Sequence, residues 1–286
     1  DNKIEIDDYI NHPNFQSLND AVVEIHQPHH KNPINDYLIG GESKARLRIA
    51  LEEIIANKIS YLSIKEQNQS RPAEKFENNT LATNIEENLP FSLTPDQKKS
   101  YQEIAKDMAS GSPMLRLLQG DVGSGKTIVA ALITAHVVED QKQVVILAPT
   151  TILANQHYES FREWYGDNEN IVLLTSKLPV KEKREIYQKI RDGVVKIIIG
   201  THAVFQDELI YQNLSLVIYD EQHRFGVNQR LKLKEKANDY PHQLLLSATP
   251  IPRTMAMGVL SGLDISTIRS LPPNRIPVTT STLTNS

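Results

Sequence analysis

From Leu89 onward, short runs of β-forming apolar residues alternate with helical patterns, and this alternation limits the possible fold more than any other feature of the chain. The runs are residues 114–118, 144–148, 171–175, 196–199, 214–220 and 243–247. Residues 197–199 and 244–246 are apolar at every position, as in strands that are buried on both faces. The alternation therefore predicts an α/β fold with a parallel sheet flanked by helices.

The first 88 residues lack this alternation. Residues 1–40 are polar and contain a single short helical pattern, near Leu18 to His26. Between residues 42 and 67, apolar residues recur at spacings of three and four, which predicts a long amphipathic helix packed against the α/β part. Residues 66–88 are rich in Asn, Glu, Gln and Ser, so we expect a linker or mobile loop and a boundary near residue 85.

Composition excludes some classes of protein. With 286 residues, 40% of them apolar, the chain is long enough for one large domain, or for one domain with an appendage. The net charge of −4 provides no overall basic field, so any nucleic acid would have to be bound by local donors. The chain has no cysteine, which excludes disulfides and thiolate metal sites. It also lacks an apolar run of about 18 residues and a signal-peptide pattern, so we expect a protein that is neither membrane-spanning nor secreted.

A phosphate-binding pattern lies after the first predicted strand. Residues 120–127 read Gly-Asp-Val-Gly-Ser-Gly-Lys-Thr, which fits G-x-x-x-x-G-K-[ST], and a predicted helix follows. Glycines let successive backbone N–H groups surround phosphates, and the helix N-terminus adds its positive end. Lys126 is expected to reach the outer phosphates and Thr127 to bind Mg²⁺; the alternative is a glycine-rich turn beside a surface lysine. The candidate nucleotide-binding residues are Gly120, Asp121, Val122, Gly123, Ser124, Gly125, Lys126 and Thr127.

An acidic pair ends another predicted strand, about 90 residues later in the chain. Apolar residues 216–219 run directly into Asp220 and Glu221. Asp220 can hold Mg²⁺ through water, and Glu221 can polarise the attacking water, because phosphoryl transfer depends on positioning and charge stabilisation. Alone, such a pair is often a helix cap, but the phosphate-binding pattern favours catalysis. The sequence thus predicts an ATP and Mg²⁺ site in which Lys126, Asp220 and Glu221 are catalytic and Thr127 and Asp220 bind the metal.

Hydroxyl residues follow the last of these strands. Ser247 and Thr249 lie in a Ser-Ala-Thr-Pro sequence, where their hydroxyls could bond to His223 and couple the nucleotide state to the neighbouring surface. The alternative is an ordinary turn ahead of a helix.

A third group lies upstream of the phosphate loop. Phe91 offers an aromatic face, and Thr94 and Gln97 are candidates for contact with adenine. The alternative for Thr94 is a helix N-cap followed by proline at the first helical position, and both interpretations can hold together.

In this order, the blocks resemble the first RecA-like domain of a superfamily 2 helicase, and they most resemble the RecG family of branched-DNA translocases. The resemblance covers residues 89–280 and rests on residues 89–94 with Gln97, 120–127, 148–150 with Leu153, Ala154, Gln156 and His157, 200–203 with Phe205 and Gln206, 220–227, 247–254, and 269–273 with Arg275, Pro277 and Val278. Thr151 and Asn274 depart from the pattern, but neither position holds a proposed catalytic group. The transcription-repair coupling factor resembles the chain less well, because it usually carries Glu and Phe where this chain has Gln222 and Ser124.

The resemblance implies a RecA-like P-loop NTPase fold, a mainly helical connector ahead of it, and four segments. Residues 1–40 would end or follow a DNA-binding wedge domain, 41–88 would form the connector helix and polar linker, 89–268 the helicase ATP-binding domain, and 269–286 the start of a linker. A wedge domain before Asp1 and a second RecA-like domain after Ser286 would belong to the same polypeptide. Since the second domain would carry an arginine finger, the chain as given is expected to bind nucleotide but to hydrolyse it very slowly.

The resemblance also implies a function. The full-length protein would be an ATP-dependent translocase on branched DNA, acting in DNA repair and recombination, in the cytoplasm at the nucleoid. Thr150, Gln156, Thr201 and His202 would line the DNA strand through neutral donors, which position a strand without reading its sequence. For each of these residues the alternative is an ordinary turn.

Two other classes of protein stay open from the residues alone. A P-loop metabolic kinase would need an acceptor pocket, and the sequence shows no lid or acceptor motif. A non-hydrolysing nucleic-acid binding module would keep the fold but would not need Glu221.

Overall fold

The computed structural model describes residues 16–27, 43–69, 71–166, 170–176, 178–221, 233, 235–237, 240–249 and 263–270. The chain divides into two compact units: Asp1–Lys65 with Arg253–Gly262, and Glu66–Pro252 with Leu263–Ser286. None of the described helices is long and apolar enough to cross a membrane.

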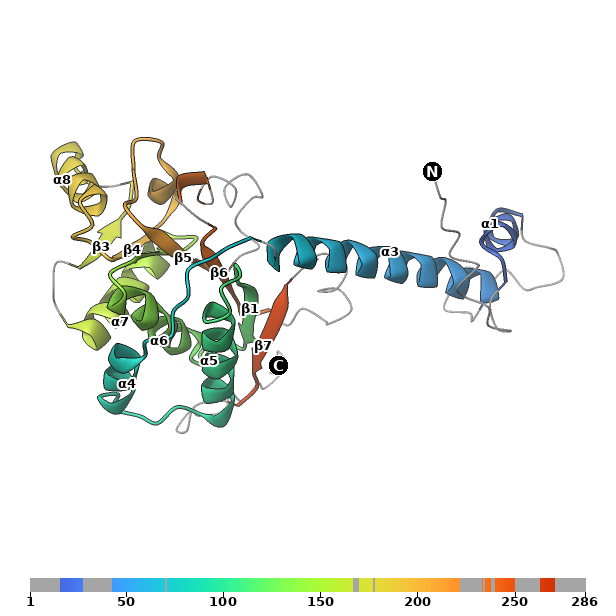
Figure 1. Ribbon diagram of the computed structural model, residues 1–286, viewed down its shortest axis with the longest axis horizontal. Helices are drawn as coiled ribbons and strands as arrows, with labels where there is room; N and C mark the ends of the chain where they lie inside the picture. Colours follow the sequence, from blue (N-terminus) through green and yellow to red (C-terminus); the bar gives the residue numbers. More distant parts are fainter. Residues whose placement is uncertain are drawn as a thin grey trace, which may run out of the picture. The chain divides into compact units, whose positions relative to one another are not determined.

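The first unit contains the helix α1 (Leu18–His26) and most of the long helix α3 (Lys44–Gln69), both labelled in Figure 1. Ser17 is the N-cap of α1, and its side chain accepts a hydrogen bond from the Asp20 N–H, as N-cap residues commonly do. The buried side chain of Arg48, on α3, donates from Nε to the carbonyl of Gln16, just before the cap of α1, at 3.1 Å. Both helices that the sequence predicts are therefore present. The expected apolar face of α3 is wrong, because apolar residues such as Leu47, Ile54 and Ile59 are exposed. Its packing against the α/β part stays a prediction.

Over its described residues, the second unit contains a seven-stranded sheet in the order β3-β4-β2-β5-β6-β1-β7. Its strands are β1 (Leu115–Gly120), β2 (Gln143–Leu147), β3 (Ile171–Leu174), β4 (Ile197–Gly200), β5 (Leu214–Asp220), β6 (His242–Ser247) and β7 (Asp264–Ile268). Every pairing is parallel, so all the carboxyl ends meet at one edge. The predicted parallel α/β fold is thereby confirmed.

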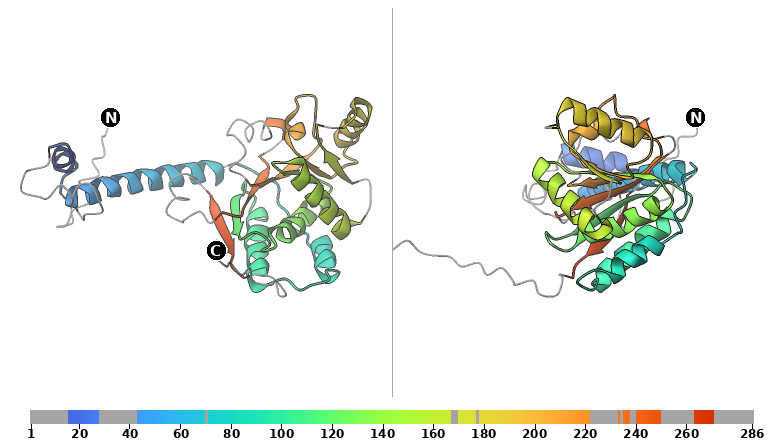
Figure 2. Two further views of the ribbon diagram at one scale, coloured as in Figure 1. Left: turned by 180° about the vertical axis from the view of Figure 1, so that it is seen from behind. Right: turned by 90° about the vertical axis from the view of Figure 1, so that its left-hand side faces the viewer.

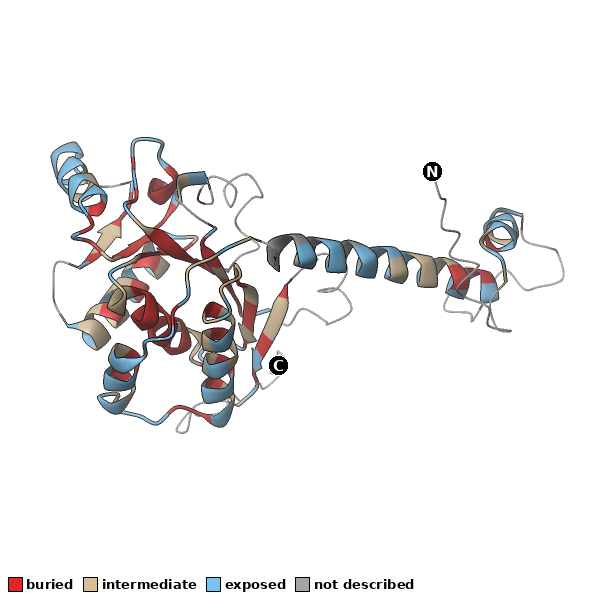
Figure 3. Ribbon diagram, in the orientation of Figure 1, coloured by how far each residue is buried: buried red, intermediate tan, exposed pale blue. Residues whose placement is uncertain are grey.

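Helices pack on this sheet and bury its strands. They are α4 (Thr80–Glu87), α5 (Pro95–Met108), α6 (Lys126–Glu139), α7 (Thr151–Tyr165) and α8 (Val180–Arg191), with the 3-10 helix η2 (His202–Phe205). Contacts join α6 to β1, β2 and β5, α7 to β3 and β4, and α5 to β7 (Figure 2). α6 is buried from Ile128 through Val137, and β2 and β5 are buried at every residue (Figure 3), so the core lies around these three elements.

β7 is absent from the strands that the sequence predicts. It pairs with β1 at the edge of the sheet, with Arg116 opposite Asp264 and Leu118 opposite Ser266. It reads Asp-Ile-Ser-Thr-Ile, with three polar residues in five, so it lacks the continuous apolar run that identified the other strands. Its pairing with a strand about 150 residues away was not visible in local composition.

Residues 71–88 correct the prediction of a linker or mobile loop. Phe76, Ala82 and Ile85 are buried in the core of the second unit, and α4 packs against α6. Backbone groups of this segment are also paired: the Phe76 N–H donates to the Met108 carbonyl at 3.2 Å. A few well-placed apolar side chains and satisfied backbone groups fix the segment, although its average composition is polar. The division of residues 1–88 into wedge and connector stays a prediction.

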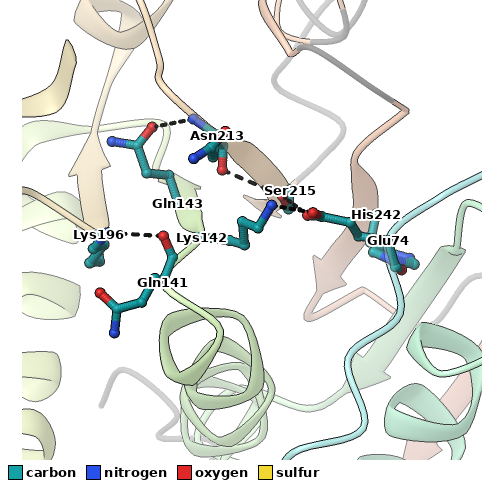
Figure 4. A network of polar contacts seen from close by, with 8 residues as sticks. All are labelled: Glu74, Gln141, Lys142, Gln143, Lys196, Asn213, Ser215 and His242. Atoms are coloured by element: carbon teal, nitrogen blue, oxygen red, sulfur yellow. Dashed lines mark hydrogen bonds and ion pairs between the residues drawn. The ribbon is translucent and has the colours of Figure 1, made fainter. Parts of the chain in front are cut away.

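A polar network centred on Glu74 fastens this segment to the amino-terminal edge of the sheet (Figure 4). Lys142, just before β2, forms an ion pair with the Glu74 carboxylate. Ser215 in β5 donates its hydroxyl to the same carboxylate at 2.8 Å, and His242 in β6 bonds through Nε2 to the Glu74 carbonyl at 2.8 Å. Beside them, the Gln143 side-chain oxygen accepts the backbone N–H groups that precede β5. The segment therefore contacts the starts of several strands at once.

His242 in this network is buried in its neutral form. The Met114 N–H donates to its Nδ1 at 3.1 Å, so Nε2 carries the proton that is donated to Glu74. Burial lowers the pKa of His242 below its ordinary value, although the neighbouring Glu74 and Asp107 oppose the shift. Because the unfolded chain then binds more protons in mild acid, the contribution of His242 to stability is complete above an ordinary pKa of about 6.5. That contribution is lost as the pH falls below this value toward the lower pKa of the folded state.

We therefore expect the free energy of unfolding, measured by urea denaturation, to fall from about pH 7 to about pH 5, and to fall less steeply in His242→Gln. His136 retains part of the slope, because burial also lowers its pKa. His202→Gln is the matched control, because it removes an exposed histidine outside the network around Glu74. An unaltered slope in His242→Gln would show that this histidine does not carry the pH dependence.

Candidate active site

The predicted phosphate-binding loop connects β1 to α6 in a conformation that requires glycine. Gly123 and Gly125 have φ angles of 74° and 83°, in the left-handed region that favours glycine. A β-carbon on Gly125 would lie 2.1 Å from Nε2 of Gln97. On Gly120, one would lie 2.5 Å from the buried hydroxyl of Ser124. The strand, loop and helix that the motif needs are all present in the order expected.

Lys126 lies across this loop. Its Nζ donates to the carbonyls of Gly120 and Asp121, at 2.7 and 2.9 Å. Burial lowers the pKa of Lys126, while the charges of Asp220, Glu221 and Asp121 oppose that shift. Lys126 follows β1 and the acidic pair lies at the end of β5, and only β6 separates these two strands, so Lys126, Asp220 and Glu221 lie at the same edge of the sheet.

The sheet explains why residues so far apart in the sequence meet. Asp220 is the last residue of β5 and pairs with Leu246 of β6, which in turn pairs with Leu118 of β1. Two strand spacings, roughly 10 Å, therefore separate the backbone of Asp220 from the strand that leads into the loop. Glu221, directly after β5, has a φ angle of 51°. Such a conformation is uncommon for a residue other than glycine and is found at functional sites.

Gln97 and Thr94 form the start of α5 and brace the phosphate loop. The Thr94 N–H donates to Oε1 of Gln97 at 2.8 Å, and the Gln97 N–H donates to the Thr94 hydroxyl at 3.3 Å, which completes a capping box. Nε2 of Gln97 donates to the Ser124 carbonyl at 2.8 Å. The N-cap interpretation of Thr94 is confirmed. Contact of Thr94 or Gln97 with adenine stays a prediction, and the Gln97 amide already bonds to protein groups on both sides.

An apolar pocket of about 270 Å³ lies beside the loop. It is lined by Phe91, Ser92, Gln97, Gly125, Thr127, Ile128 and Trp164. Phe91 is 44% exposed, so its ring is accessible to a ligand. Trp164, near the end of α7, is a residue that the sequence reasoning missed; it belongs to no motif, and its helix begins at the end of a different strand.

Ser247 and Thr249 form a hydrogen-bonded turn at the end of β6. Their hydroxyls are 3.0 Å apart, and the Thr249 N–H donates to the Ser247 hydroxyl at 3.2 Å. Ser247 pairs with Gln119, next to the phosphate loop. His223, their predicted partner, lies outside the described residues, so its coupling role stays a prediction.

The four residues predicted to contact DNA follow β2 and β4, which are neighbours in the sheet. Thr150 caps α7, and its hydroxyl accepts from the Leu153 N–H at 3.3 Å. Gln156 and His202 are exposed, whereas Thr201 is 8% exposed. These residues thus lie at the same carboxyl edge of the sheet as the nucleotide-site residues. They follow β2 and β4, whereas the nucleotide-site residues lie at the ends of β1 and β5.

A buried contact links Asp220 to α7, the helix that carries Gln156, and it was also missed. Nε2 of His157, on α7, lies 2.8 Å from Oδ2 of Asp220. His157 is part of a block that resembles the helicase family, but neither its spacing nor its type indicated a role.

The donor set fits a magnesium ion. Over the part of the chain that the structure describes, no group of three or more His, Cys, Asp or Glu residues could hold a metal by itself. Magnesium, however, is usually bound by one or two carboxylates together with phosphate oxygens and water. The carboxylate of Asp220, at the same edge of the sheet as the phosphate loop, matches that requirement.

The fold, the phosphate loop and the acidic pair together define the class of protein to which the chain belongs. The sequence pattern of the DEAD/DEAH box helicases matches residues 94–257, which is more than half of the chain. The chain therefore belongs to the DEAD/DEAH box helicase family.

Within that family, the chain is similar to the RecG helicases. The chain is 43% identical to the ATP-dependent DNA helicase RecG of Pasteurella multocida over 94% of its own length, and 43% identical to that of Escherichia coli K12 over 93%. It covers 39% of the length of each of these two relatives. A solved structure described as RecG bound to a three-way DNA junction matches 82% of this chain and 32% of its own, with a TM-score of 0.71 and 39% identity. The shared region contains the first motor domain of RecG.

Proposed function

We propose that the protein binds ATP and Mg²⁺ at this site and, as part of the full-length protein, couples ATP hydrolysis to movement on branched DNA. The observation that carries the proposal is the strand order: Lys126 follows β1 and the acidic pair Asp220 and Glu221 ends β5, at the same carboxyl edge of one parallel sheet with only β6 between the two strands. The relatives named above are described as ATP-dependent DNA helicases, and the similar solved structure is described as RecG bound to a three-way DNA junction. DNA repair and recombination, at the nucleoid, are the processes in which we place the full-length protein.

Each residue has a distinct part in the proposed reaction. Backbone N–H groups of residues 120–127 hold the phosphates, and Lys126 exchanges its carbonyl partners for phosphate oxygens. Mg²⁺, when bound, neutralises charge on the reacting phosphates, and Asp220 and Thr127 are the residues that would hold it. Glu221 orients the attacking water and accepts its proton. The protein accelerates the reaction by positioning the reacting groups and stabilising their charge, because phosphoryl transfer involves little covalent chemistry by protein side chains.

On the same edge, the proposed DNA track runs over β2 and β4. Thr150, Gln156, Thr201 and His202 would contact the strand through hydroxyl, amide and ring groups, supported by the N-terminus of α7. Neutral donors of this kind explain how a chain with a net charge of −4 can bind DNA. A second RecA-like domain and a wedge domain of the same polypeptide would complete the track.

ATP hydrolysis by the full-length protein, measured with and without a three-way DNA junction, tests this function. We expect the junction to stimulate turnover. Turnover that does not respond to DNA would favour the metabolic kinase, and DNA binding without turnover would favour the non-hydrolysing module.

The pocket beside the loop allows a direct measurement of nucleotide binding. Trp164 is the single tryptophan of the chain and lines the pocket, so we expect ADP with Mg²⁺ to change its fluorescence. Phe91→Ala should weaken ADP binding by roughly 2- to 10-fold, since an aromatic stacking contact contributes about 0.5–1.5 kcal/mol.

Tyr240→Ala is the matched control for Phe91→Ala. Tyr240 is also a partly exposed aromatic residue, but it lies just before β6, at the opposite edge of the sheet. Its loss should leave ADP binding unchanged. Equal affinities of the Phe91→Ala and unmodified chains would exclude the pocket as the site of the base.

A further inference from the structure

His157 and Asp220 form a buried polar pair between two elements. Nε2 of His157 lies 2.8 Å from Oδ2 of Asp220, and the two residues are 8% and 9% exposed. An ionised carboxylate only accepts hydrogen bonds, so Nε2 of His157 carries the proton and donates it. Asp220 ends β5, whereas His157 lies on α7, the helix that follows the neighbouring strand β2. The pair is therefore a direct link between the end of β5 and α7.

This hydrogen bond limits the positions that the carboxylate can take. One of its two oxygens, Oδ2, is held by the imidazole, which restricts the rotation of the carboxylate and so fixes where Oδ1 lies. Both groups are shielded from solvent. A hydrogen bond between buried groups is electrostatically stronger than one at the surface. Groups that bond to metal-binding side chains commonly change metal affinity by about 10- to 100-fold when they are removed.

We propose that His157 is a positioning residue that orients Asp220 for Mg²⁺ and makes α7 the connection between the DNA track and the metal site. This inference rests on the proposed function of the site. α7 begins at its cap Thr150 and carries the exposed Gln156 next to the buried His157. A helix of 15 residues moves largely as one body, so a strand bound at its first turn and at Gln156 would act on the orientation of Asp220.

Two substitutions separate the hydrogen bond from the volume of the side chain. His157→Leu fills most of the space but removes the donor, whereas His157→Gln keeps an N–H donor with a similar reach. With a fluorescent ADP analogue and this chain, we expect the Mg²⁺ concentration for half-maximal binding to rise about 10- to 100-fold in His157→Leu. His157→Gln should stay within about 3-fold of the unmodified chain, and nucleotide binding in the presence of EDTA should be equal in all three.

His136→Leu is the matched control. His136 is also buried and bonds to the Tyr101 hydroxyl at 2.8 Å, but on α6 and outside the site. This variant should lower the melting temperature without changing the Mg²⁺ requirement. An unchanged Mg²⁺ requirement in His157→Leu would overturn the positioning role, and so would an equal rise in His157→Leu and His157→Gln.

The connection through α7 is tested in the full-length protein by measuring whether DNA binding changes the Mg²⁺ concentration needed for nucleotide binding. If DNA acts on Asp220 through His157, a three-way junction should shift the Mg²⁺ requirement of the unmodified protein and of His157→Gln, but not that of His157→Leu. A shift of the same size in all three would overturn the connection. Failure of the proposed function would give a different result from failure of this inference, because the unmodified chain would then not bind the nucleotide at all.

Discussion

Replacement of Glu221 by glutamine is expected to lower the kcat of ATP hydrolysis by the full-length protein by about 10³-fold, the typical effect of removing a general base. Nucleotide affinity should stay within about 3-fold, because the amide keeps the size of the side chain and Lys126 keeps its place in the loop. Glutamine also has a β-carbon, so the left-handed backbone at this position is equally strained in both proteins. Steady-state hydrolysis with a DNA junction, together with ADP binding, measures both quantities.

The control for this variant is Glu208→Gln, which neutralises an exposed carboxylate outside the site. It should retain full turnover. If Glu221→Gln hydrolysed ATP at the unmodified rate, Glu221 would lose its role as the residue that activates water. If it failed to bind nucleotide, the charge of Glu221 would be needed for binding instead.

The success of the fold prediction has a physical cause. Strands covered on both faces must be apolar throughout, so runs such as residues 197–199 identify central strands without any knowledge of their partners. β7 lies at the edge of the sheet and has no such constraint, and for that reason its polar and apolar residues gave no signal. The packing of Phe76 and α4 was likewise hidden, because a segment that is polar on average can be fixed by three buried side chains.

The site was predictable where its residues follow strands. The carboxyl ends of parallel strands meet at one edge, which places the loop after β1 and the acidic pair after β5 near each other. His157 and Trp164 lie within α7, where helical packing and not a strand end decides their neighbours. The bond from His157 to Asp220 crosses 63 positions of sequence, and nothing in the local pattern indicates it. Gln97 was noticed, but its bond to the Ser124 carbonyl was not expected.

Lys126→Ala is expected to weaken the binding of ATP with Mg²⁺ by roughly 100-fold, since a hydrogen bond to a charged group contributes about 1.5–3 kcal/mol and a phosphate can accept more than one. The structure supports a large effect, because burial has already removed part of the hydration of the ammonium. Calorimetric titration of this chain with ATP and Mg²⁺ measures the loss directly.

Lys142→Ala is the matched control for the loss of a lysine. Lys142 pairs with Glu74 at the amino-terminal edge of the sheet, away from the phosphate loop, so its removal should affect stability and leave ATP affinity unchanged. If Lys126→Ala bound ATP as tightly as Lys142→Ala does, the loop between β1 and α6 would not be the phosphate site. The acidic pair at the end of β5 would then have no phosphate to act on, and the proposed ATPase would lose its basis.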